Sequence, residues 1–206
     1  MSLRLFDDAE MRPESAGHCS SMWPQGCVYL AEEIGPIAAQ EVLRWLDGLP
    51  ESQWRTDLSR RVIHYGWRYD YRAKMITPDM EIGPLPLELR DLAVRLYEAD
   101  CFERIPDQVI VNEYLPGQGI AMHTDHPNFG PTVATISLGD AWTMDFLDPE
   151  SGEECSHLLE VGSALILSGA ARNQWQHGIA KRKTEPDGRK RRRRVSLTFR
   201  TVESVS

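Results

Sequence analysis

His123 and Asp125, a histidine and an aspartate one residue apart, are the pair in this chain best suited to metal chemistry. Alternate side chains of a β-strand point to the same face, so an imidazole nitrogen and a carboxylate oxygen at these positions can reach one ion. Together they make two thirds of a facial two-histidine, one-carboxylate site, which leaves positions on ferrous iron open for a co-substrate and dioxygen. Such a triplet also arises by chance as surface polarity, so the interpretation depends on a third ligand.

The best candidate for the third ligand is His177, in the segment 174–179. It follows an apolar stretch with strand character and precedes Gly178, where a backbone can approach a small site closely. Taken alone, such a histidine is more often a hydrogen-bonded residue of the core or rim. The other histidines are poorer candidates because they lie in a weakly patterned head, an aromatic strand, beside a proline or in a charged turn: His18, His64, His126 and His157.

A positively charged face is expected on the last strand of the chain, residues 194–200. Its apolar and polar residues alternate, so one face carries two arginines and two hydroxyls: Arg194, Ser196, Thr198 and Arg200. A core strand would not direct two arginines along one face unless an anion neutralised them. Arginine binds carboxylates bidentately, so this face suits a dicarboxylate held beside the metal. The alternative is an edge strand with a solvated polar face.

The elements that must position these residues change in character along the chain. Residues 1–25 have little periodicity and predict a loosely ordered segment. Two amphipathic helices are expected, one starting near Pro36 and one over 85–96, whose apolar residues recur at helical spacing. Between them, the aromatic-rich stretch 60–71 predicts a strand or a hairpin, and its rings either pack on the sheet or form a platform for a base.

Short strands dominate from Cys101 onward. We expect them over 108–114, 132–138, 142–147, 163–167 and 194–201. Helices first and short antiparallel strands afterwards predict an α+β fold, a double-stranded β-helix (jelly roll) with two N-terminal supporting helices. Such a fold forms a funnel that can hold a ligand. We expect one domain over 26–206, with the jelly-roll core at about 108–201.

Composition and charge limit the class of protein further. The chain has 206 residues and is 41% hydrophobic, enough for one substantial core. It shows no membrane-spanning stretch, no secretion signal and no Cys-X-X-Cys pair among its four cysteines, so we expect a cytoplasmic monomer with free thiols. The formal net charge is −8, yet nine basic side chains lie in 181–194, a segment that either contacts phosphates or forms a solvated loop.

Four motifs, in order, resemble the iron(II)/2-oxoglutarate oxygenases of the AlkB family: NEYLPGQGIAMHTD, SLGDAWTMDF, QWQHGI and RRVSLTFR. They lie within residues 108–201, about half the chain. The resemblance implies that His123, Asp125 and His177 bind iron(II). It also implies five contacts with 2-oxoglutarate: Asn112, Tyr114, Arg194, Ser196 and Arg200. Several family members carry asparagine where this chain has Ser196.

The resemblance also implies a reaction. Oxidative decarboxylation of 2-oxoglutarate by dioxygen gives succinate and carbon dioxide and drives hydroxylation of a substrate carbon. On an N-methylated base, hydroxylation ends in release of formaldehyde and restoration of the base. The base must lie in a single strand or be flipped out of a duplex to reach the metal. The wall of its pocket is expected at Trp67, Tyr69, His126 and Asp145.

Details of the motifs (GQGI, MDF and WQHGI) resemble the branch of the family that acts on transfer-RNA wobble uridines more than the DNA-repair branch. Eukaryotic members of that branch carry added RNA-binding and methyltransferase domains, which this sequence does not show. The prediction is therefore oxidation of alkylated DNA or RNA, with demethylation favoured over hydroxylation. The alternatives are the same oxygenase core acting on a protein side chain or small metabolite, and a degenerate binding module without activity.

Overall fold

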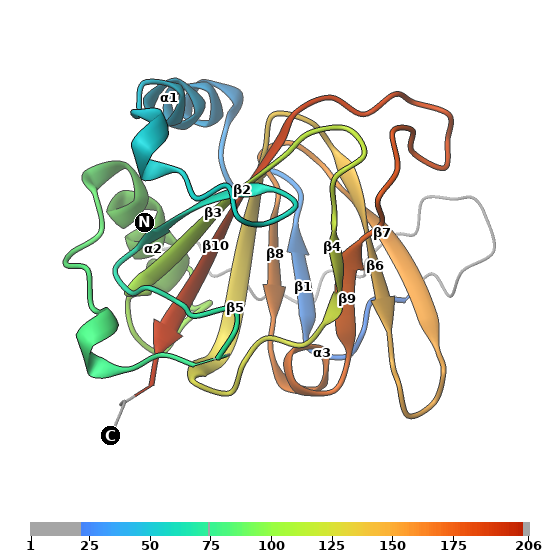
Figure 1. The fold of residues 1–206 in the computed structure, drawn as a ribbon. Coiled ribbons are helices and arrows are strands. Elements are labelled where there is room, and N and C mark those ends of the chain that lie inside the picture. Colours follow the sequence, from blue (N-terminus) through green and yellow to red (C-terminus); the bar gives the residue numbers. More distant parts are fainter. Residues whose placement is uncertain (1–21, 74, 204–206) are drawn as a thin grey trace.

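The structure, a computed structural model, describes residues 22–73 and 75–203 (Figure 1). Most of the N-terminal segment predicted to be loosely ordered lies outside these residues. The larger of two antiparallel sheets has the strand order β1 (Cys27–Leu30), β8 (Ala164–Leu167), β5 (Phe129–Leu138), β10 (Arg194–Val202), β3 (Gln108–Tyr114) and β2 (Arg61–Tyr65). The smaller has the order β4 (Ile120–His123), β9 (Gln176–Ile179), β6 (Trp142–Leu147) and β7 (Glu154–Leu159). This is the jelly-roll arrangement that the strand pattern predicts.

Two helices of the front half, α1 (Pro36–Asp47) and α2 (Leu87–Glu98), lie together at one side of the larger sheet (Figure 1). Helix α1 has Pro36 in its first turn, where the missing N–H costs no hydrogen bond, and the N–H of Gly48 caps its last turn. Apolar residues on both helices share one buried cluster with β3, β5 and β10: among them Val42, Leu46, Leu92, Leu96, Val111 and Leu197. The other face of the sheet is left for the space between the sheets.

Strand β10 shows how the sequence divides these two faces. Val195, Leu197 and Phe199 belong to the cluster under the helices. The residues that alternate with them along the strand line a cavity on the opposite face: Arg194, Ser196, Thr198 and Arg200. The alternation read from the sequence is therefore the division between core and cavity, and the edge-strand alternative is wrong because β10 lies between β3 and β5.

The aromatic stretch 60–71, expected as a strand or a hairpin, forms strand β2 only as far as Tyr65, because Gly66 has φ +76°. A Cβ at Gly66 would lie 1.8 Å from the carbonyl oxygen of Asp107, so only glycine fits this turn. His157 lies in strand β7 rather than in a turn.

The remaining helices are short: α3 (Gly169–Asn173), η1 (Glu51–Gln53) and η2 (Pro78–Met80). Helix α3 connects β8 to β9 and so directly precedes the segment that carries His177. Within 22–73 and 75–203, no helix has the length and apolar character needed to cross a bilayer.

Candidate active site

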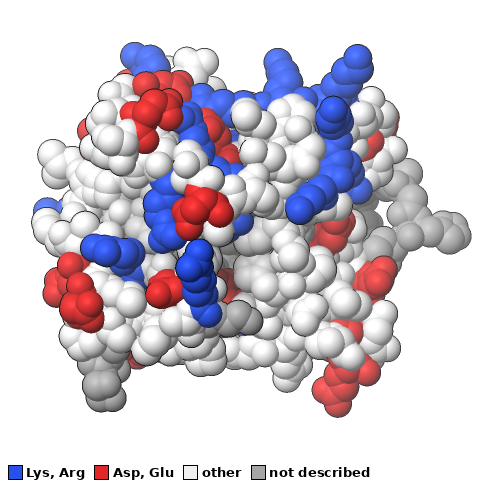
Figure 2. Space-filling view, viewed as in Figure 1, with Lys and Arg blue, Asp and Glu red and all other residues white. Residues whose placement is uncertain are grey.

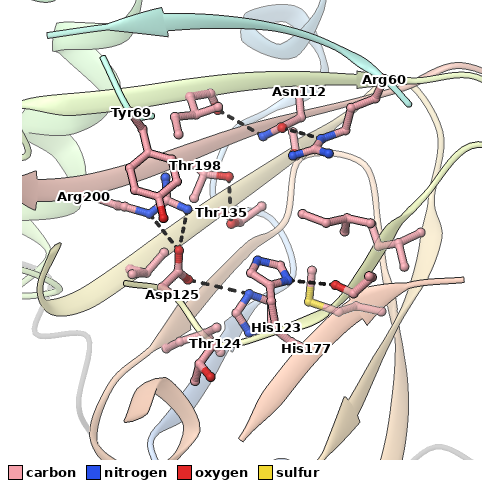
Figure 3. A pocket seen from close by; sticks show the side chains of 18 of the residues that line it. Arg60, Tyr69, Asn112, His123, Thr124, Asp125, Thr135, His177, Thr198 and Arg200 are labelled. Carbon is pink, nitrogen blue, oxygen red and sulfur yellow. Dashed lines mark hydrogen bonds and ion pairs between the residues drawn. The ribbon is translucent and has the colours of Figure 1, made fainter. Parts of the chain in front are cut away.

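A cavity of about 330 Å³ lies between the two sheets and receives side chains from both (Figure 3). Ten of the twelve residues predicted to bind iron, 2-oxoglutarate or substrate line it: Tyr69, Asn112, Tyr114, His123, Asp125, His126, His177, Arg194, Ser196 and Arg200. They come from β3, β4, β9, β10 and the connecting segments after β2 and β4. The fold thus brings together residues more than a hundred positions apart in the chain.

The two candidate metal-binding histidines lie on neighbouring strands. His123 ends β4 and is the register partner of His177 on β9, and their ring centroids are 4.6 Å apart. His123 Nδ1 lies 2.9 Å from the carbonyl oxygen of Ala121. Because a carbonyl only accepts, Nδ1 carries the proton and Nε2 keeps its lone pair. His123 is therefore in the tautomer that a metal ligand through Nε2 requires.

Asp125 follows β4 by two residues and is buried beside His177. Its Oδ2 atom lies 3.6 Å from His177 Nε2, and its Oδ1 atom accepts hydrogen bonds from Arg200 Nη2 at 2.5 Å and Nε at 3.0 Å (Figure 3). Burial would raise the pKa of Asp125, but Arg200, His177, His123 and Arg172 together hold it well below its usual range. Burial lowers the pKa of His177 to about 4. Both groups are in the unprotonated form that binds a metal.

These residues fit an iron(II) ion chemically. Two imidazoles and one carboxylate are the donor set of a facial iron site with open positions. Asp125 Oδ2 and His177 Nδ1 are buried polar atoms with no hydrogen-bond partner in the part of the chain that the structure describes. Within the described ranges, however, no three His, Cys, Asp or Glu side chains already form a metal-binding cluster. Asp125 is instead held by Arg200, and its role as a ligand stays a prediction.

Arg194 provides the clearest sign of an anionic ligand. Its side chain is fully buried, and burial lowers its pKa to about 10. Nη2 donates to Ser137 Oγ at 2.9 Å, while Nε and Nη1 have no hydrogen-bond partner among residues 22–73 and 75–203. No Asp or Glu of the described residues forms an ion pair with it. A buried guanidinium with unused donors is costly unless an anion binds it, so Arg194 fits the distal carboxylate of 2-oxoglutarate.

The other predicted 2-oxoglutarate contacts surround Arg194. Across the β3–β10 ladder, Tyr114 is the register partner of Arg194, and Asn112 is that of Ser196. The Arg194 guanidinium carbon lies 5.7 Å from the centroid of the Tyr114 ring. Arg200 also lines the cavity, but its guanidinium is engaged by Asp125 and by Gln108 Oε1 at 3.4 Å. A direct contact of Arg200 with 2-oxoglutarate stays a prediction.

Two of the four residues expected in the substrate wall reach the cavity. The rings of Tyr69 and His126 have centroids 6.3 Å apart, and both residues line it. Trp67 does not line it. Beyond the turn at Gly66, Trp67 instead packs against a small cluster of Ile76, Phe129 and Val202.

Asp145 also lies outside the cavity lining. Its neighbour on β6, Met144, faces the cavity, so Asp145 points to the opposite face of the strand. There it accepts a hydrogen bond from Ser156 Oγ at 2.7 Å and lies 3.6 Å from Arg182.

Sequence reasoning missed the roles of two residues: Arg60, which lines the cavity, and Arg172, which does not line it. Arg60 donates from Nε to Asn112 Oδ1 at 2.7 Å, a contact across 52 positions for which the sequence gives no signal. Tyr71 belongs to the aromatic stretch expected either to pack on the sheet or to form a platform for a base; it lines the cavity, and its hydroxyl lies 3.2 Å from His64 Nε2. Arg172 of α3 donates to the carbonyl oxygens of Asp125, His126 and Phe129 and so holds the loop after β4.

The basic segment 181–194 is ordered by internal contacts. Glu185 is buried, accepts a 2.6 Å hydrogen bond from Thr143 Oγ1 and pairs with buried Arg191. Arg189 pairs with Asp140 at 3.0 Å. A freely solvated loop is therefore excluded. Four basic residues of the segment stay exposed, Lys181, Lys183, Lys190 and Arg192, and Figure 2 shows Lys and Arg side chains along the upper edge of the molecule.

Comparison with known proteins identifies the family of this chain. The family model of the 2OG-Fe(II) oxygenase superfamily matches residues 43–200. A relative in Mus musculus, the tRNA (carboxymethyluridine(34)-5-O)-methyltransferase ALKBH8, is 31% identical over 166 residues, which cover 78% of this chain and 25% of that protein. The "Alkylated DNA repair protein ALKBH8 homolog" of Arabidopsis thaliana is 30% identical over 86% of this chain and 56% of its own length.

The fold has a similar solved structure in OsALKBH1. It superposes with a TM-score of 0.66 at 21% identity and covers 87% of this chain and 99% of that one. This chain spans about a quarter of the length of the mouse relative. The family model covers most of the chain and includes every residue that lines the cavity. The chain belongs to the 2OG-Fe(II) oxygenase superfamily and, within it, to the AlkB family.

Proposed function

We propose that this chain is an iron(II)/2-oxoglutarate-dependent dioxygenase that oxidises alkylated nucleic acid, with demethylation of N-methylated bases in DNA or RNA as the favoured reaction. One observation carries the proposal. A single cavity contains the imidazoles of His123 and His177, the carboxylate of Asp125 and the buried Arg194, which has no carboxylate partner among the described residues. These are the groups that an iron(II) ion and a dicarboxylate need side by side.

The chain's own residues would divide the work as follows. His123, Asp125 and His177 would hold the iron, and Arg194, Ser196, Asn112 and Tyr114 would hold 2-oxoglutarate. When bound, these two groups supply the oxidising chemistry, with dioxygen as the oxidant. Arg200 keeps the Asp125 carboxylate ionised and oriented. Apolar walls exclude water around the dicarboxylate: Met144, Leu165, Leu167 and Ile179.

The names of the relatives support the substrate class. One is named for a modified uridine of tRNA and another for repair of alkylated DNA. Tyr69 and His126 give the cavity two aromatic rings on which an unpaired or flipped base can stack. The four exposed basic residues of 181–194 would contact phosphates.

Succinate formation tests the proposal most directly. Purified protein would be incubated with iron(II) and 2-oxoglutarate, with and without methylated DNA and RNA oligonucleotides, alongside His177→Ala. We expect methylated strands to stimulate succinate formation and to release formaldehyde, and the variant to be silent. No turnover across a panel of methylated strands would refute the nucleic-acid substrate. No succinate under any condition would refute the oxygenase.

A protein side chain or small metabolite is the second candidate substrate. Internal pairing of Arg182, Arg189, Arg191 and Arg193 favours it, because these arginines are then not free to bind phosphate. The discriminating measurement is oligonucleotide affinity against salt. Phosphate contacts make the affinity fall steeply as salt rises, whereas absent or salt-independent binding favours the second candidate.

We also propose that residues 26–206 fold as one domain in which α1 and α2 support the jelly roll. The buried cluster shared by the helices and the larger sheet favours this organisation. We propose further that the protein is a cytoplasmic monomer. Sedimentation of the purified protein tests the monomer, and limited proteolysis tests the domain.

A further inference from the structure

Arg60 lies against the cavity without an assigned role. It directly precedes β2, and its residue is only 8% exposed. Val62, two positions on, is the register partner of Asn112, so Arg60 follows the same face of the sheet as Asn112 and the cavity. No Asp or Glu within 22–73 and 75–203 forms an ion pair with Arg60. This buried cation is therefore held by a contact other than an ion pair.

The contact that holds Arg60 is the side-chain amide of Asn112. Arg60 Nε donates to Asn112 Oδ1 at 2.7 Å (Figure 3). Among the described residues, the other end of the amide, Nδ2, reaches only the carbonyl oxygen of Ile110, at 3.5 Å, the outer limit of a hydrogen bond. The amide therefore has one strongly engaged end and one end almost unused.

This arrangement decides which way the amide faces. An amide can present either an acceptor oxygen or a donor nitrogen to a ligand, but a guanidinium has donors only. Arg60 must therefore take the oxygen, which leaves the N–H₂ group of Asn112 as the end available to the cavity. A donor there suits a carboxylate or keto oxygen. Arg194 is near the same place, because the guanidinium carbons of Arg60 and Arg194 each lie 5.7 Å from the centroid of the Tyr114 ring.

We propose that Arg60 is a positioning residue for 2-oxoglutarate: it fixes the orientation of the Asn112 amide so that a donor faces the co-substrate. The inference rests on the proposed function, because it takes 2-oxoglutarate as the ligand of Asn112. Arg60 acts through Asn112 and need not touch the co-substrate.

A double-mutant cycle on co-substrate binding tests this inference. The readout is the dissociation constant of 2-oxoglutarate for protein loaded with manganese(II), which accepts oxygen and nitrogen ligands, measured by titration calorimetry. Loss of a hydrogen bond to a charged ligand weakens binding roughly tenfold to a hundredfold, so Arg60→Met and Asn112→Ala should each do so. In the Asn112→Ala background, Arg60→Met should change the constant by less than about threefold, because no amide is left to orient.

Two further variants separate positioning from general effects. Arg60→Lys keeps a donor for Asn112 Oδ1 and should recover part of the affinity. Arg61→Met is the matched control: Arg61 is the register partner of Glu113, pairs with it on the other face of β2, and should leave 2-oxoglutarate binding unchanged. Thermal melts of all variants identify any that fail to fold.

Contrary outcomes point to different failures. Independent effects of Arg60→Met and Asn112→Ala that multiply in the double variant would overturn the inference, because Arg60 would then contact the co-substrate itself. An equal effect of Arg61→Met would overturn it as well. No 2-oxoglutarate binding by the unmodified protein would instead overturn the proposed function, and no effect of Asn112→Ala would remove Asn112 from the co-substrate site.

Discussion

At the scale of single residues, Arg194 is suited to bind an anion but lowers the stability of the ligand-free protein. A buried guanidinium with two unpartnered donors destabilises the ligand-free protein. We expect Arg194→Met to raise the melting temperature of the ligand-free protein or leave it unchanged. We also expect it to abolish the additional stabilisation that 2-oxoglutarate gives the unmodified protein.

Differential scanning calorimetry with and without 2-oxoglutarate measures both effects. Arg44→Met, an exposed arginine on the outer helix α1, is the control and should keep the ligand-induced shift. A ligand-induced shift that survives in Arg194→Met would show that the carboxylate is bound elsewhere.

His64 gives the pH dependence at this scale. It is buried, receives the backbone N–H of Tyr69 on Nδ1, and has a pKa lowered to about 4 by burial and by nearby Arg55, Arg200, Arg68 and Arg60. Its pKa in the unfolded chain is about 6.5. The unfolded state therefore binds the proton first, so stability is complete above pH 6.5 and is lost as pH falls toward 4.

The size of this loss follows from the pKa difference. Between pH 6.5 and pH 5, His64 should account for about 2 kcal/mol of lost stability, at about 1.4 kcal/mol per pH unit. Denaturant unfolding at several pH values measures it. His64→Gln should flatten the curve over this range, whereas parallel curves for the two proteins would show that His64 does not titrate in this way.

At the scale of elements, the end of β2 depends on one glycine. Gly66 (φ +76°) and Gly152 (φ +74°) have nearly the same backbone conformation, but only at Gly66 does an added Cβ meet backbone. Gly152→Ala should cost about 1–2 kcal/mol from the left-handed conformation alone. Gly66→Ala should cost that plus displacement of Asp107, several kcal/mol in all, by denaturant unfolding. Equal costs would show that the turn yields easily.

The same turn explains what could and could not be read from the sequence. The two faces of β10 were predictable because its apolar and polar residues alternate. The grouping of His123, Asp125 and His177 in one cavity was predictable because they lie in recognisable motifs. The position of Trp67 was predicted wrongly because a period of two gives the direction of side chains only along a continuous strand, and the turn at Gly66 interrupts it. Arg60 was invisible because its contact with Asn112 spans 52 positions and leaves no local pattern.

The connection between β9 and β10 also behaves as an element, held by Glu185. Removing this carboxylate would leave Arg191 buried without its ion-pair partner and Thr143 without its acceptor. We expect Glu185→Ala to lose about 3–5 kcal/mol of stability and to expose Lys181 to Lys190 to trypsin. Asp187→Asn, an exposed change in the same loop, should do neither. Unchanged trypsin sensitivity would show that other contacts order the loop.

At the scale of the whole molecule, an acidic protein must bind a polyanion through a small basic area. The net charge is −8, so the overall field opposes a nucleic acid and binding must come from local contacts. If the four exposed residues Lys181, Lys183, Lys190 and Arg192 contact phosphates, log affinity for a single strand should fall with log salt at a slope of about −3. Lys183→Gln with Lys190→Gln should then reduce the slope by about 1.4, whereas Arg44→Gln on helix α1, outside the segment 181–194, should leave it unchanged. Fluorescence anisotropy with a methylated single strand across a salt series measures these slopes. Equal slopes for all three proteins would place the phosphate contacts elsewhere. Loss of affinity without a change of slope would mean that replacing the two lysines disturbs the fold.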